Sequence, residues 1–359
     1  MGAQRIPGAH SDSTMTDAET PAPLAFVGAG ALGQTFAGLL ASSGQAVTLL
    51  ATPRTAARLL EVGSLHLRGV VTATIPVALA PAGSGQVGIA TLAAQLPPGV
   101  GLIFLTKGHH LPEASATVRA AWPASRDDAA WVTGFQNGLA TDRLLAEVFG
   151  AGRVVGGATI LSGERDPAGA VAVTSLGATY LGELAGGTSA RVARAIDALT
   201  RAGIPASAPA DIHSVLWSKA CNAAGVFGVS VLARIPASQI FADRSLMRVY
   251  LALVRETAAI GAAYGITVGD YPHFPPIQTY VTRSEAETLA AIPTGPLPRG
   301  GSLPSMTQDL LAGRPLEVEA VFGDLAARAM QVGVPAPQLT LVRDLLRGLD
   351  RIAREATAP

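Results

Sequence analysis

A glycine-rich turn near the start of the chain limits the folds that are open to it. The pattern G-x-G-x-x-G spans residues 28–33, directly after the apolar run Leu24–Val27 and before a helical stretch at residues 34–43. A second apolar run at residues 47–50 completes a strand, turn, helix and strand, the context that a dinucleotide-binding motif requires. Small glycines there let the backbone approach a pyrophosphate at the helix N-terminus. A glycine turn without a ligand is the alternative, and we favour the cofactor site. Its predicted residues are Gly28, Ala29, Gly30, Ala31, Leu32 and Gly33.

The first half of the chain continues to alternate apolar runs with helical segments. The predicted strands are residues 24–27, 47–50, 64–67, 71–78, 102–105, 131–134, 154–160, 170–173 and 178–181. After about Asp211 the segments become long and helical. The predicted helices there are residues 212–224, 244–264, 283–291, 317–332 and 337–353. An α/β first half and a helical second half predict two domains.

The predicted organisation has three parts. Residues 1–22 lack the apolar core of a secretory signal, and we interpret them as a disordered leader or as a misassigned start. Residues 23–209 form the predicted α/β, Rossmann-type NADP-binding domain. Residues 210–356 form the predicted all-α domain, which supplies the substrate and catalytic groups and offers a surface for a homodimer.

Charge and cysteine content exclude several classes of protein. The 26 basic and 26 acidic residues balance, without a basic block, so nucleic acid is not an expected partner. The single cysteine, Cys221, excludes a disulfide within the chain and is typical of a reducing cytoplasm. The richest apolar stretch, residues 223–233, is shorter than the about 20 residues of a spanning helix, so no membrane segment is expected.

Lysine and asparagine are both scarce in this chain. Of 26 basic residues only Lys107 and Lys219 are lysine, and Asn137 and Asn222 are the only asparagines. Where arginine is the default cation, a retained lysine indicates a need for a compact ammonium that can lose its proton. Chance retention is the alternative.

Polar side chains follow the predicted strands at the edge where a Rossmann-type sheet binds its ligand. Lys107 follows the strand at residues 102–105, and Asn137 follows the strand at residues 131–134. We predict that both contact cofactor or substrate. A solvated loop is the alternative for Lys107, and an Asn-Gly turn is the alternative for Asn137.

The end of the second strand indicates the type of cofactor. NAD sites usually place a carboxylate there, whereas this chain has Thr52 and Arg54, with Arg58 one helical turn further on. Arg54 and Thr52 would instead hold a 2′-phosphate, which favours NADP(H). A solvated helix start is the alternative for Arg54.

One helix of the second half carries Lys219 and Asn222, which share a face because they are three residues apart. The surroundings of Lys219 are apolar, so its pKa should fall toward neutrality and suit a general acid. The alternative is that the methylene chain of Lys219 covers the helix surface while its ammonium group is in water.

Taken alone, two further residues have structural explanations. Ser305 would cap a helix, and Glu317 would be an acid favoured by a helix dipole. His109 and His110 lack carboxylate or cysteine partners at ligand spacing, so no metal site is expected.

Together these motifs resemble the ketopantoate reductase (2-dehydropantoate 2-reductase) family from about residue 24 to residue 351. The resemblance rests on the glycine turn, Lys107, the Q-N-G at residues 136–138, the W-S-K at residues 217–219, and the segment SMTQDLLAGRPLEVE at residues 305–319. The last is the most specific, since family members are similar in having S-M-x-x-D and a glutamate twelve residues after the serine.

The resemblance implies reduction of a 2-keto acid, ketopantoate, with NADPH. It implies that Lys219 is the catalytic lysine, that Glu317 is an acid that assists it and also contacts the cofactor, and that Ser305 binds the substrate carboxylate. Lys107 and Asn137 match positions near cofactor and substrate, and Asn222 is the expected substrate-binding amide.

The chain departs from the family pattern on the catalytic helix. Family members have Lys-x-x-x-Asn and a second Asn four residues later, whereas here Asn222 comes one residue early and Ala223 and Phe227 stand at the two positions. Either the helix shifts locally or the substrate contacts differ. The alternatives are therefore an enzyme for another 2-keto acid with a bulkier tail, and a non-catalytic NADP-binding sensor.

Overall fold

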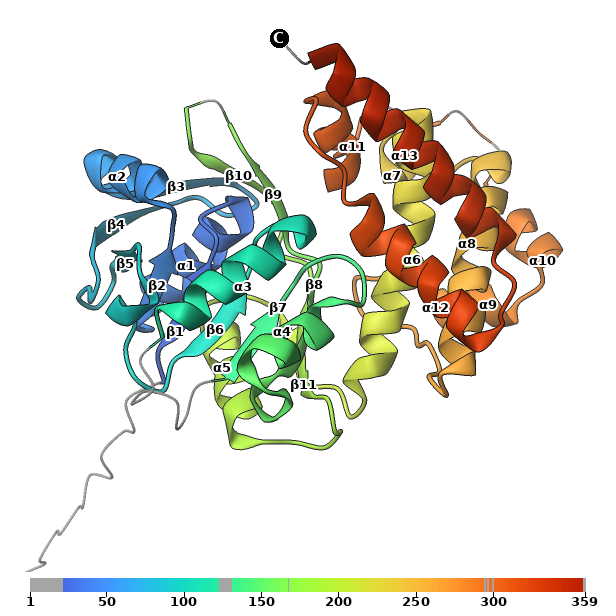
Figure 1. Cartoon of the computed structure of the whole chain (residues 1–359). Coiled ribbons are helices and arrows are strands. Elements are labelled where there is room, and N and C mark those ends of the chain that lie inside the picture. Colours follow the sequence, from blue (N-terminus) through green and yellow to red (C-terminus); the bar gives the residue numbers. More distant parts are fainter. Residues whose placement is uncertain are drawn as a thin grey trace, which may run out of the picture.

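The computed structural model describes residues 22–122, 131–166, 168–293, 295, 297–298 and 300–357. The predicted leader lies outside these residues, apart from Ala22. Figure 1 shows an α/β part, coloured blue to green, beside a helical part, coloured yellow to red. The predicted fold class, a Rossmann-type domain followed by an all-α domain, is confirmed.

Five parallel strands form the part of the sheet that positions the site. They are β1 (Leu24–Val27), β2 (Val47–Leu50), β5 (Val87–Ala90), β6 (Gly101–Phe104) and β7 (Trp131–Gly134), in the order β7-β6-β1-β2-β5. All are buried along their length, as expected for parallel strands covered on both faces. The chain builds outward from β1 through β2 and then returns to add β6 on the other side. The topological switch point, where such sheets bind ligands, therefore lies between β1 and β6.

Further strands extend this sheet and add a smaller one. The order continues from β5 through β4 (Ala73–Leu79), β3 (Ser64–Gly69), β10 (Val171–Ser175) and β9 (Ser162–Arg165). The second sheet has the order β12-β11-β8, from β8 (Val155–Thr159), β11 (Thr179–Glu183) and β12 (Ala206–Ser207). The sequence prediction missed β5 and β9.

The first domain has five described α-helices, of which two begin with a side-chain cap. They are α1 (Ala31–Ser42), α2 (Pro53–Val62), α3 (Leu111–Ala120), α4 (Thr141–Phe149) and α5 (Ala190–Arg201). Thr52 caps α2, which has Pro53 in its first turn, and Ser189 caps α5. The C-cap of α2, Gly63, has a φ of 74°.

The second domain contains helices and irregular connections, with no strand among its described residues. Its elements are α6 (Ile212–Ala233), α7 (Ala237–Ile240), α8 (Arg244–Ala263), α9 (Ile277–Thr282), α10 (Glu285–Ala290), α11 (Ser305–Leu311), the π-helical turn η5 (Glu319–Gly323), α12 (Asp324–Val332) and α13 (Pro337–Thr357). The predicted helix at residues 283–291 corresponds to α10, whereas α9 was not predicted. The helix predicted at residues 317–332 begins as a π turn.

Helix α6 is the central helix of this domain and runs nine residues beyond its predicted end. A Cβ at Gly225 would lie 2.4 Å from the Tyr250 ring, and one at Gly228 would lie 2.6 Å from Leu253, so glycine allows close packing on α8. Of the described helices, α6 alone is long and apolar enough to match a membrane span, and 78% of its most apolar window is buried in the protein. It is therefore explained as a core helix.

Candidate active site

The glycine turn brings the ends of β1 and β6 together. Gly28 has a φ of 117°, and a Cβ there would lie 3.2 Å from the carbonyl carbon of Leu105. At Gly33 a Cβ would lie 2.0 Å from the Gly28 carbonyl oxygen. Both positions therefore require glycine, because any side chain would force the turn away from the strand that follows.

The start of α1 has the features of a site for a pyrophosphate. Gly30 is the N-cap and supplies no side-chain cap, and no acid lies in the first turn. A Cβ at Gly30 would meet nothing within 4 Å, so the space over the turn is open. Nearby, the Thr106 hydroxyl is buried without a hydrogen-bond partner among the described residues. Uncapped helix amides, open space and an orphaned hydroxyl fit a bound dinucleotide.

At the end of β2, the two residues predicted to bind a 2′-phosphate, Thr52 and Arg54, have different surroundings. The Thr52 hydroxyl is already used as the cap of α2, since it accepts from the Thr55 N–H at 3.4 Å and donates to the Thr55 hydroxyl at 3.1 Å. Arg54 is exposed. Arg58 donates to the Ala168 carbonyl at 3.3 Å. Arg54 therefore stays the predicted phosphate-binding residue at this strand end.

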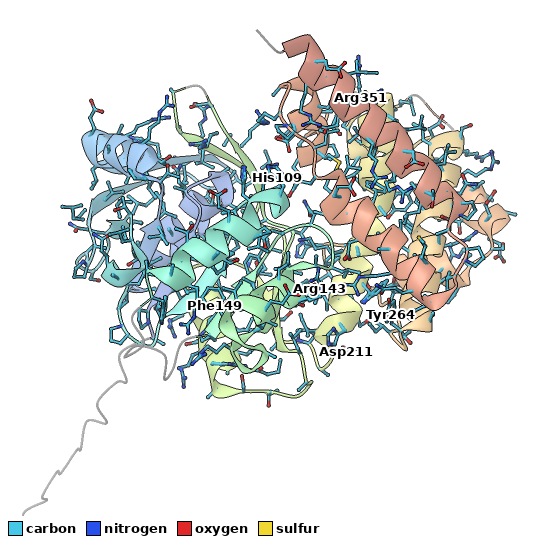
Figure 2. The ribbon with its side chains drawn as sticks, in the orientation of Figure 1. His109, Arg143, Phe149, Asp211, Tyr264 and Arg351 are labelled. Atoms are coloured by element: carbon cyan, nitrogen blue, oxygen red, sulfur yellow. The ribbon has the colours of Figure 1, made fainter. Side chains whose placement is uncertain are left out.

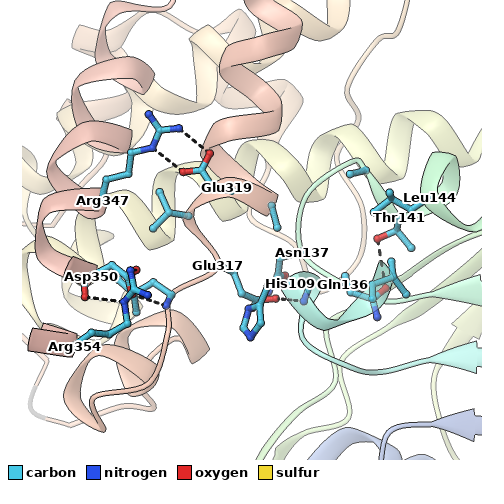
Figure 3. A pocket seen from close by; sticks show the side chains of 16 residues that line it. His109, Gln136, Asn137, Thr141, Leu144, Glu317, Glu319, Arg347, Asp350 and Arg354 are labelled. Carbon is cyan, nitrogen blue, oxygen red and sulfur yellow. Dashed lines mark hydrogen bonds and ion pairs between the residues drawn. The ribbon is translucent and has the colours of Figure 1, made fainter. Parts of the chain in front are cut away.

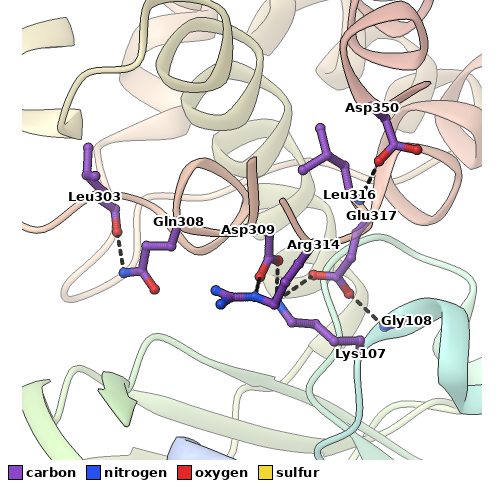
Figure 4. Close-up of polar contacts among 9 residues, drawn as sticks. All are labelled: Lys107, Gly108, Leu303, Gln308, Asp309, Arg314, Leu316, Glu317 and Asp350. Atoms are coloured by element: carbon purple, nitrogen blue, oxygen red, sulfur yellow. Dashed lines mark hydrogen bonds and ion pairs between the residues drawn. The ribbon is translucent and has the colours of Figure 1, made fainter. Parts of the chain in front are cut away.

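Lys107 forms an ion pair across the two domains (Figure 4). Its Nζ lies 2.5 Å from Oδ2 of Asp309 in α11 and 3.8 Å from Oε2 of Glu317. The Asp309 side chain is only 2% exposed, and its other oxygen accepts from Arg314 at 2.8 Å. A solvated loop therefore does not describe Lys107, which joins the end of β6 to the segment at residues 305–317.

Glu317 makes a second contact between the domains. Its side chain is 4% exposed, and Oε1 accepts from the Gly108 N–H at 2.6 Å. Its backbone carbonyl accepts from the Val321 N–H at the start of the following helix. Glu317 thus precedes a helix, as its structural explanation requires, while its carboxylate faces the other domain.

Ser305 is the first residue of α11 and is exposed. The N-cap position belongs to Pro304, and α11 has no side-chain cap. The structural alternative for Ser305, that it caps a helix, is therefore wrong, and its role in substrate binding stays a prediction. The chain reaches this position in an extended conformation at Pro304, which has a ψ of 149° and supplies no hydroxyl.

Lys219 points from α6 toward the end of β7. Its Nζ donates to the Phe135 carbonyl at 3.3 Å. Burial lowers the pKa of Lys219 to about 8, and the negative charge of Glu317 opposes this shift. An ammonium with a pKa near neutrality, facing the cofactor edge of the sheet, can donate a proton at physiological pH.

Asn137 follows β7 and lines a cavity of about 500 Å³ between the domains. Figure 3 shows it near His109 and Glu317. The turn interpretation also holds, because Gly138 has a φ of 93° and a Cβ there would lie 1.9 Å from the Ala320 carbonyl oxygen. The tight Asn-Gly turn therefore packs on η5 and presents Asn137 to the cavity.

Asn222 is not brought into this cluster. Its Oδ1 accepts from the Tyr250 hydroxyl at 3.0 Å, which directs it to the packing of α6 on α8. Helix α6 is continuous across this region, so a local shift of the helix does not account for the displaced asparagine. Ala223 and Phe227, at the two departing positions, are both buried.

The residues missed by sequence reasoning are Asp309, Arg314 and Gln136. Asp309 is the aspartate of S-M-x-x-D, so a signal was present, but nothing local shows that it pairs with Lys107. Gln136 donates to the carbonyls of Phe104 at 3.0 Å and of Thr106 at 3.1 Å, which ties β7 to the end of β6. The described residues contain no cluster of three metal-ligating side chains.

Comparison with known proteins gives a consistent result. A family described as ketopantoate reductase PanE/ApbA matches residues 24–186, and its C-terminal counterpart matches residues 211–350. A 2-dehydropantoate 2-reductase of Pyrococcus abyssi is 24% identical over 91% of this chain and 97% of its own.

Two solved structures share the fold. A 2-dehydropantoate 2-reductase from Geobacter metallireducens has a TM-score of 0.74 at 23% identity, covering 91% of this chain and 99% of its own. A D-mandelate dehydrogenase with NADH and anilino(oxo)acetate has a TM-score of 0.72 at 17% identity, covering 92% and 99%.

Proposed function

Because the chain belongs to the ketopantoate reductase PanE/ApbA family, we propose that it reduces 2-dehydropantoate to pantoate with NADPH. Membership makes it an oxidoreductase that acts on CH–OH groups with a nicotinamide cofactor. The identity of the substrate, the use of NADPH rather than NADH, and the role of Lys219 as the proton donor go beyond family membership and are what we propose. We assign the reaction to the cytoplasm, which the single cysteine favours.

One observation carries the proposal. Lys219, on the helical domain, directs a partly buried ammonium to the carbonyl of Phe135, at the cofactor edge of the sheet. Its pKa of about 8 is far below that of a solvated lysine. A sensor would need no such acid, whereas reduction of a ketone needs a proton at the carbonyl oxygen.

In the proposed mechanism, NADPH supplies the hydride that reduces the carbonyl carbon. The Lys219 ammonium hydrogen-bonds the carbonyl oxygen and transfers its proton there as negative charge develops, leaving a neutral amine. Such acid catalysis contributes about 10²–10⁴-fold. Solvent then reprotonates the amine. The charge of Glu317 favours the protonated form of Lys219 at the start of each cycle.

The remaining proposed residues bind and orient. The amides at the start of α1 hold the pyrophosphate, and Arg54 neutralises the 2′-phosphate. Lys107 and Asn137 follow the neighbouring strands β6 and β7 and would contact the nicotinamide end of a bound cofactor, and Glu317 lies opposite them on the other domain. The exposed hydroxyl of Ser305 donates to the substrate carboxylate.

A second candidate is an enzyme for a bulkier 2-keto acid. Ala223 and Phe227 place apolar side chains where family members have asparagines, and the likeness to a D-mandelate dehydrogenase shows that this fold accommodates such an enzyme. A reductase for an aromatic 2-keto acid would use the same Lys219 chemistry in a less polar pocket.

The test is NADPH oxidation, followed by absorbance, with ketopantoate and a series of aliphatic and aromatic 2-keto acids. We expect the highest kcat/KM with ketopantoate. A higher value with an aromatic acid would replace the proposed substrate with the second candidate. No turnover of any acid, despite tight NADPH binding, would favour the sensor.

A further inference from the structure

The turn at residues 137–139 belongs to the first domain in sequence, yet the helical domain holds most of it. The turn follows β7 and precedes α4. The Leu139 side chain packs against the core of the helical domain, and a Cβ at Gly138 would lie 1.9 Å from the Ala320 carbonyl oxygen of η5. From α12, Arg328 donates to the Leu139 carbonyl at 3.2 Å. Apolar packing, a close backbone contact and a hydrogen bond thus dock the turn on the helical domain.

The residue before the turn is held by its own sheet instead. Gln136 donates to the carbonyls of Phe104 at 3.0 Å and of Thr106 at 3.1 Å. Its Oε1 accepts from the Thr141 hydroxyl at 3.4 Å. Asn137 therefore lies between a residue fixed to the cofactor-binding sheet and residues fixed to the helical domain, and Figure 3 shows it in the cavity that separates the two. Its orientation thus depends on the contacts that hold the turn to the helical domain.

Arg328 is held in place by two groups of its own domain. Its Nε lies 2.7 Å from Oδ2 of Asp324, four residues earlier in the same helix. Its guanidinium carbon lies 5.9 Å from the centre of the Tyr264 ring, which Figure 2 labels on the helical domain. The Arg328 side chain is only 22% exposed. A guanidinium fixed by a carboxylate and an aromatic ring is pre-organised, so little side-chain freedom is lost when its Nη2 donates to the Leu139 carbonyl.

The start of α4 adds a second link between Arg328 and the segment that carries Asn137. Asp142 lies in the first turn of this helix, five residues after Asn137. Burial raises the pKa of Asp142 to about 6, and the nearby His213 and Arg328 of the helical domain oppose this shift. Attraction between the Arg328 charge and this carboxylate favours the docked arrangement. Arg328 therefore acts on both ends of the short segment that joins β7 to α4.

We propose that Arg328 is a positioning residue for the reaction, and this inference rests on the proposed role of Asn137. Arg328 acts through the Leu139 carbonyl to hold Asn137 in the orientation that contacts the substrate and the nicotinamide end of the cofactor. Arg328 is not one of the described residues that line the cavity, so its effect is transmitted by the turn. Asn137 thus takes up its working orientation only when the helical domain, which carries Lys219, is docked on the sheet.

The first test is a double-mutant cycle in the full-length protein between Arg328→Met and Asn137→Ala. It uses NADPH and the 2-keto acid that the wild type reduces fastest. Arg328→Met removes the donors and the charge and keeps an unbranched side chain. We expect each single variant to lower kcat/KM by about tenfold, the effect of one lost hydrogen bond. The double variant should also lose only about tenfold, because Arg328 acts through Asn137.

A merely structural role for Arg328 would give a different result in this cycle. The two losses would then multiply to about 100-fold in the double variant, because the residues would act independently. That result would overturn the proposal, as would an unchanged kcat/KM in Arg328→Met. A loss in Arg328→Met without a loss in Asn137→Ala would overturn it as well.

Arg201→Met is the matched control for the removal of an arginine. Arg201, in α5, also pairs with an acid four residues earlier, Asp197, but this pair lies within the first domain. Arg201→Met should leave kcat/KM within about twofold of the wild-type value. An equal loss in Arg201→Met and Arg328→Met would show that removal of any such ion pair lowers activity, which contradicts a specific role for Arg328.

Hydrogen exchange, measured by mass spectrometry, tests the docking of the turn without turnover. The reporter is the peptide at residues 135–145, in which the Leu144 N–H donates to the Ala140 carbonyl at the start of α4. We expect Arg328→Met to speed exchange in this peptide by about tenfold while peptides from β2 and α5 keep their wild-type rates. Unchanged exchange in the reporter, or faster exchange in all these peptides, would overturn the proposal. A wild type that reduces no 2-keto acid would refute the proposed function and leave this readout valid, so the two failures are distinguishable.

Discussion

The Lys107 ammonium and the Asp309 carboxylate lie 2.5 Å apart across the boundary between the two domains. Lys107 lies in the turn that follows β6, and Asp309 lies on the helix that begins at Ser305. One ion pair thus joins the residue expected near the cofactor to the segment expected to bind substrate. Arg314 holds the second oxygen of the same carboxylate, which fixes its orientation.

Asp309→Asn should therefore reduce both stability and activity. Breaking a buried ion pair from one side costs about 3–5 kcal/mol, but Lys107 and Arg314 are 38% and 56% exposed, so we expect about 1–2 kcal/mol. Denaturant unfolding measures this loss. Glu61→Gln, at an exposed acid of α2, is the control and should change stability by less than about 0.5 kcal/mol. Equal losses in the two variants would show that Asp309 contributes no more than a surface charge.

Lys219 should set the alkaline limit of the reaction. Burial lowers its pKa to about 8, and only its protonated form can donate. We expect kcat/KM for the keto acid to fall as the pH rises through about 8. A flat profile up to pH 10 would exclude a lysine with this pKa as the acid.

Because Lys219 is buried, its protonated form should lower the free energy of unfolding at neutral pH. Its pKa is lower in the folded state than in the unfolded state, so the unfolded chain binds more protons between about pH 8 and the ordinary lysine value. Stability from this group therefore rises with pH through that window. Lys219→Met should lower kcat by about 10²–10⁴-fold yet raise the Tm at pH 7, with the gain in Tm shrinking toward pH 10. A lower Tm at pH 7 would contradict this.

Gly138 should be intolerant of a side chain because of the π-helical turn that packs on it. Gly138→Ala combines a φ of 93° with a Cβ that would lie 1.9 Å from the Ala320 carbonyl oxygen, so we expect a loss of more than about 2 kcal/mol. Gly150→Ala is a matched control, since Gly150 has a φ of 89° and open space around its Cβ. It should lose only about 1 kcal/mol. Similar losses of stability in both variants would show that the close contact between residue 138 and η5 does not contribute to the effect of Gly138→Ala.

Arg54 should determine the preference for NADPH. Arg54→Ala should raise the KM for NADPH by about tenfold and leave the KM for NADH unchanged, because only NADPH carries the 2′-phosphate. Arg58→Ala, at a side chain already bonded to the Ala168 carbonyl, should change neither value by more than a few-fold. Equal effects of Arg54→Ala on both cofactors would remove Arg54 from the phosphate site.

The sequence was informative where local pattern decides the structure. The glycine turn and the residues that follow β6 and β7 lie where predicted, because strand ends in a parallel sheet share one edge. The sequence was less informative where contacts between residues far apart in the chain determine the structure. Asp309 is 202 residues from Lys107, and nothing in its own segment shows that partner.

Two other errors have specific physical causes. The predicted end of α6 came directly before Gly225. Glycines lower helix propensity, yet packing on Tyr250 and Leu253 keeps the helix continuous through Gly225 and Gly228. Asn222 shares a helix face with Lys219 by spacing, but its hydrogen bond to Tyr250 turns it toward α8. In both cases tertiary contacts outweigh a local rule.

The most direct test of the account is a comparison of Lys219→Ala and Lys219→Arg with the wild type, using NADPH and ketopantoate. Stopped-flow absorbance measures the reduction step, and fluorescence titration measures NADPH affinity. We expect kcat to fall by about 10²–10⁴-fold in both variants, because alanine has no proton and arginine does not release one, while the NADPH Kd changes by less than a few-fold. Turnover near the wild-type rate in either variant, or an equal loss of NADPH affinity, would contradict the assignment of Lys219 as the acid.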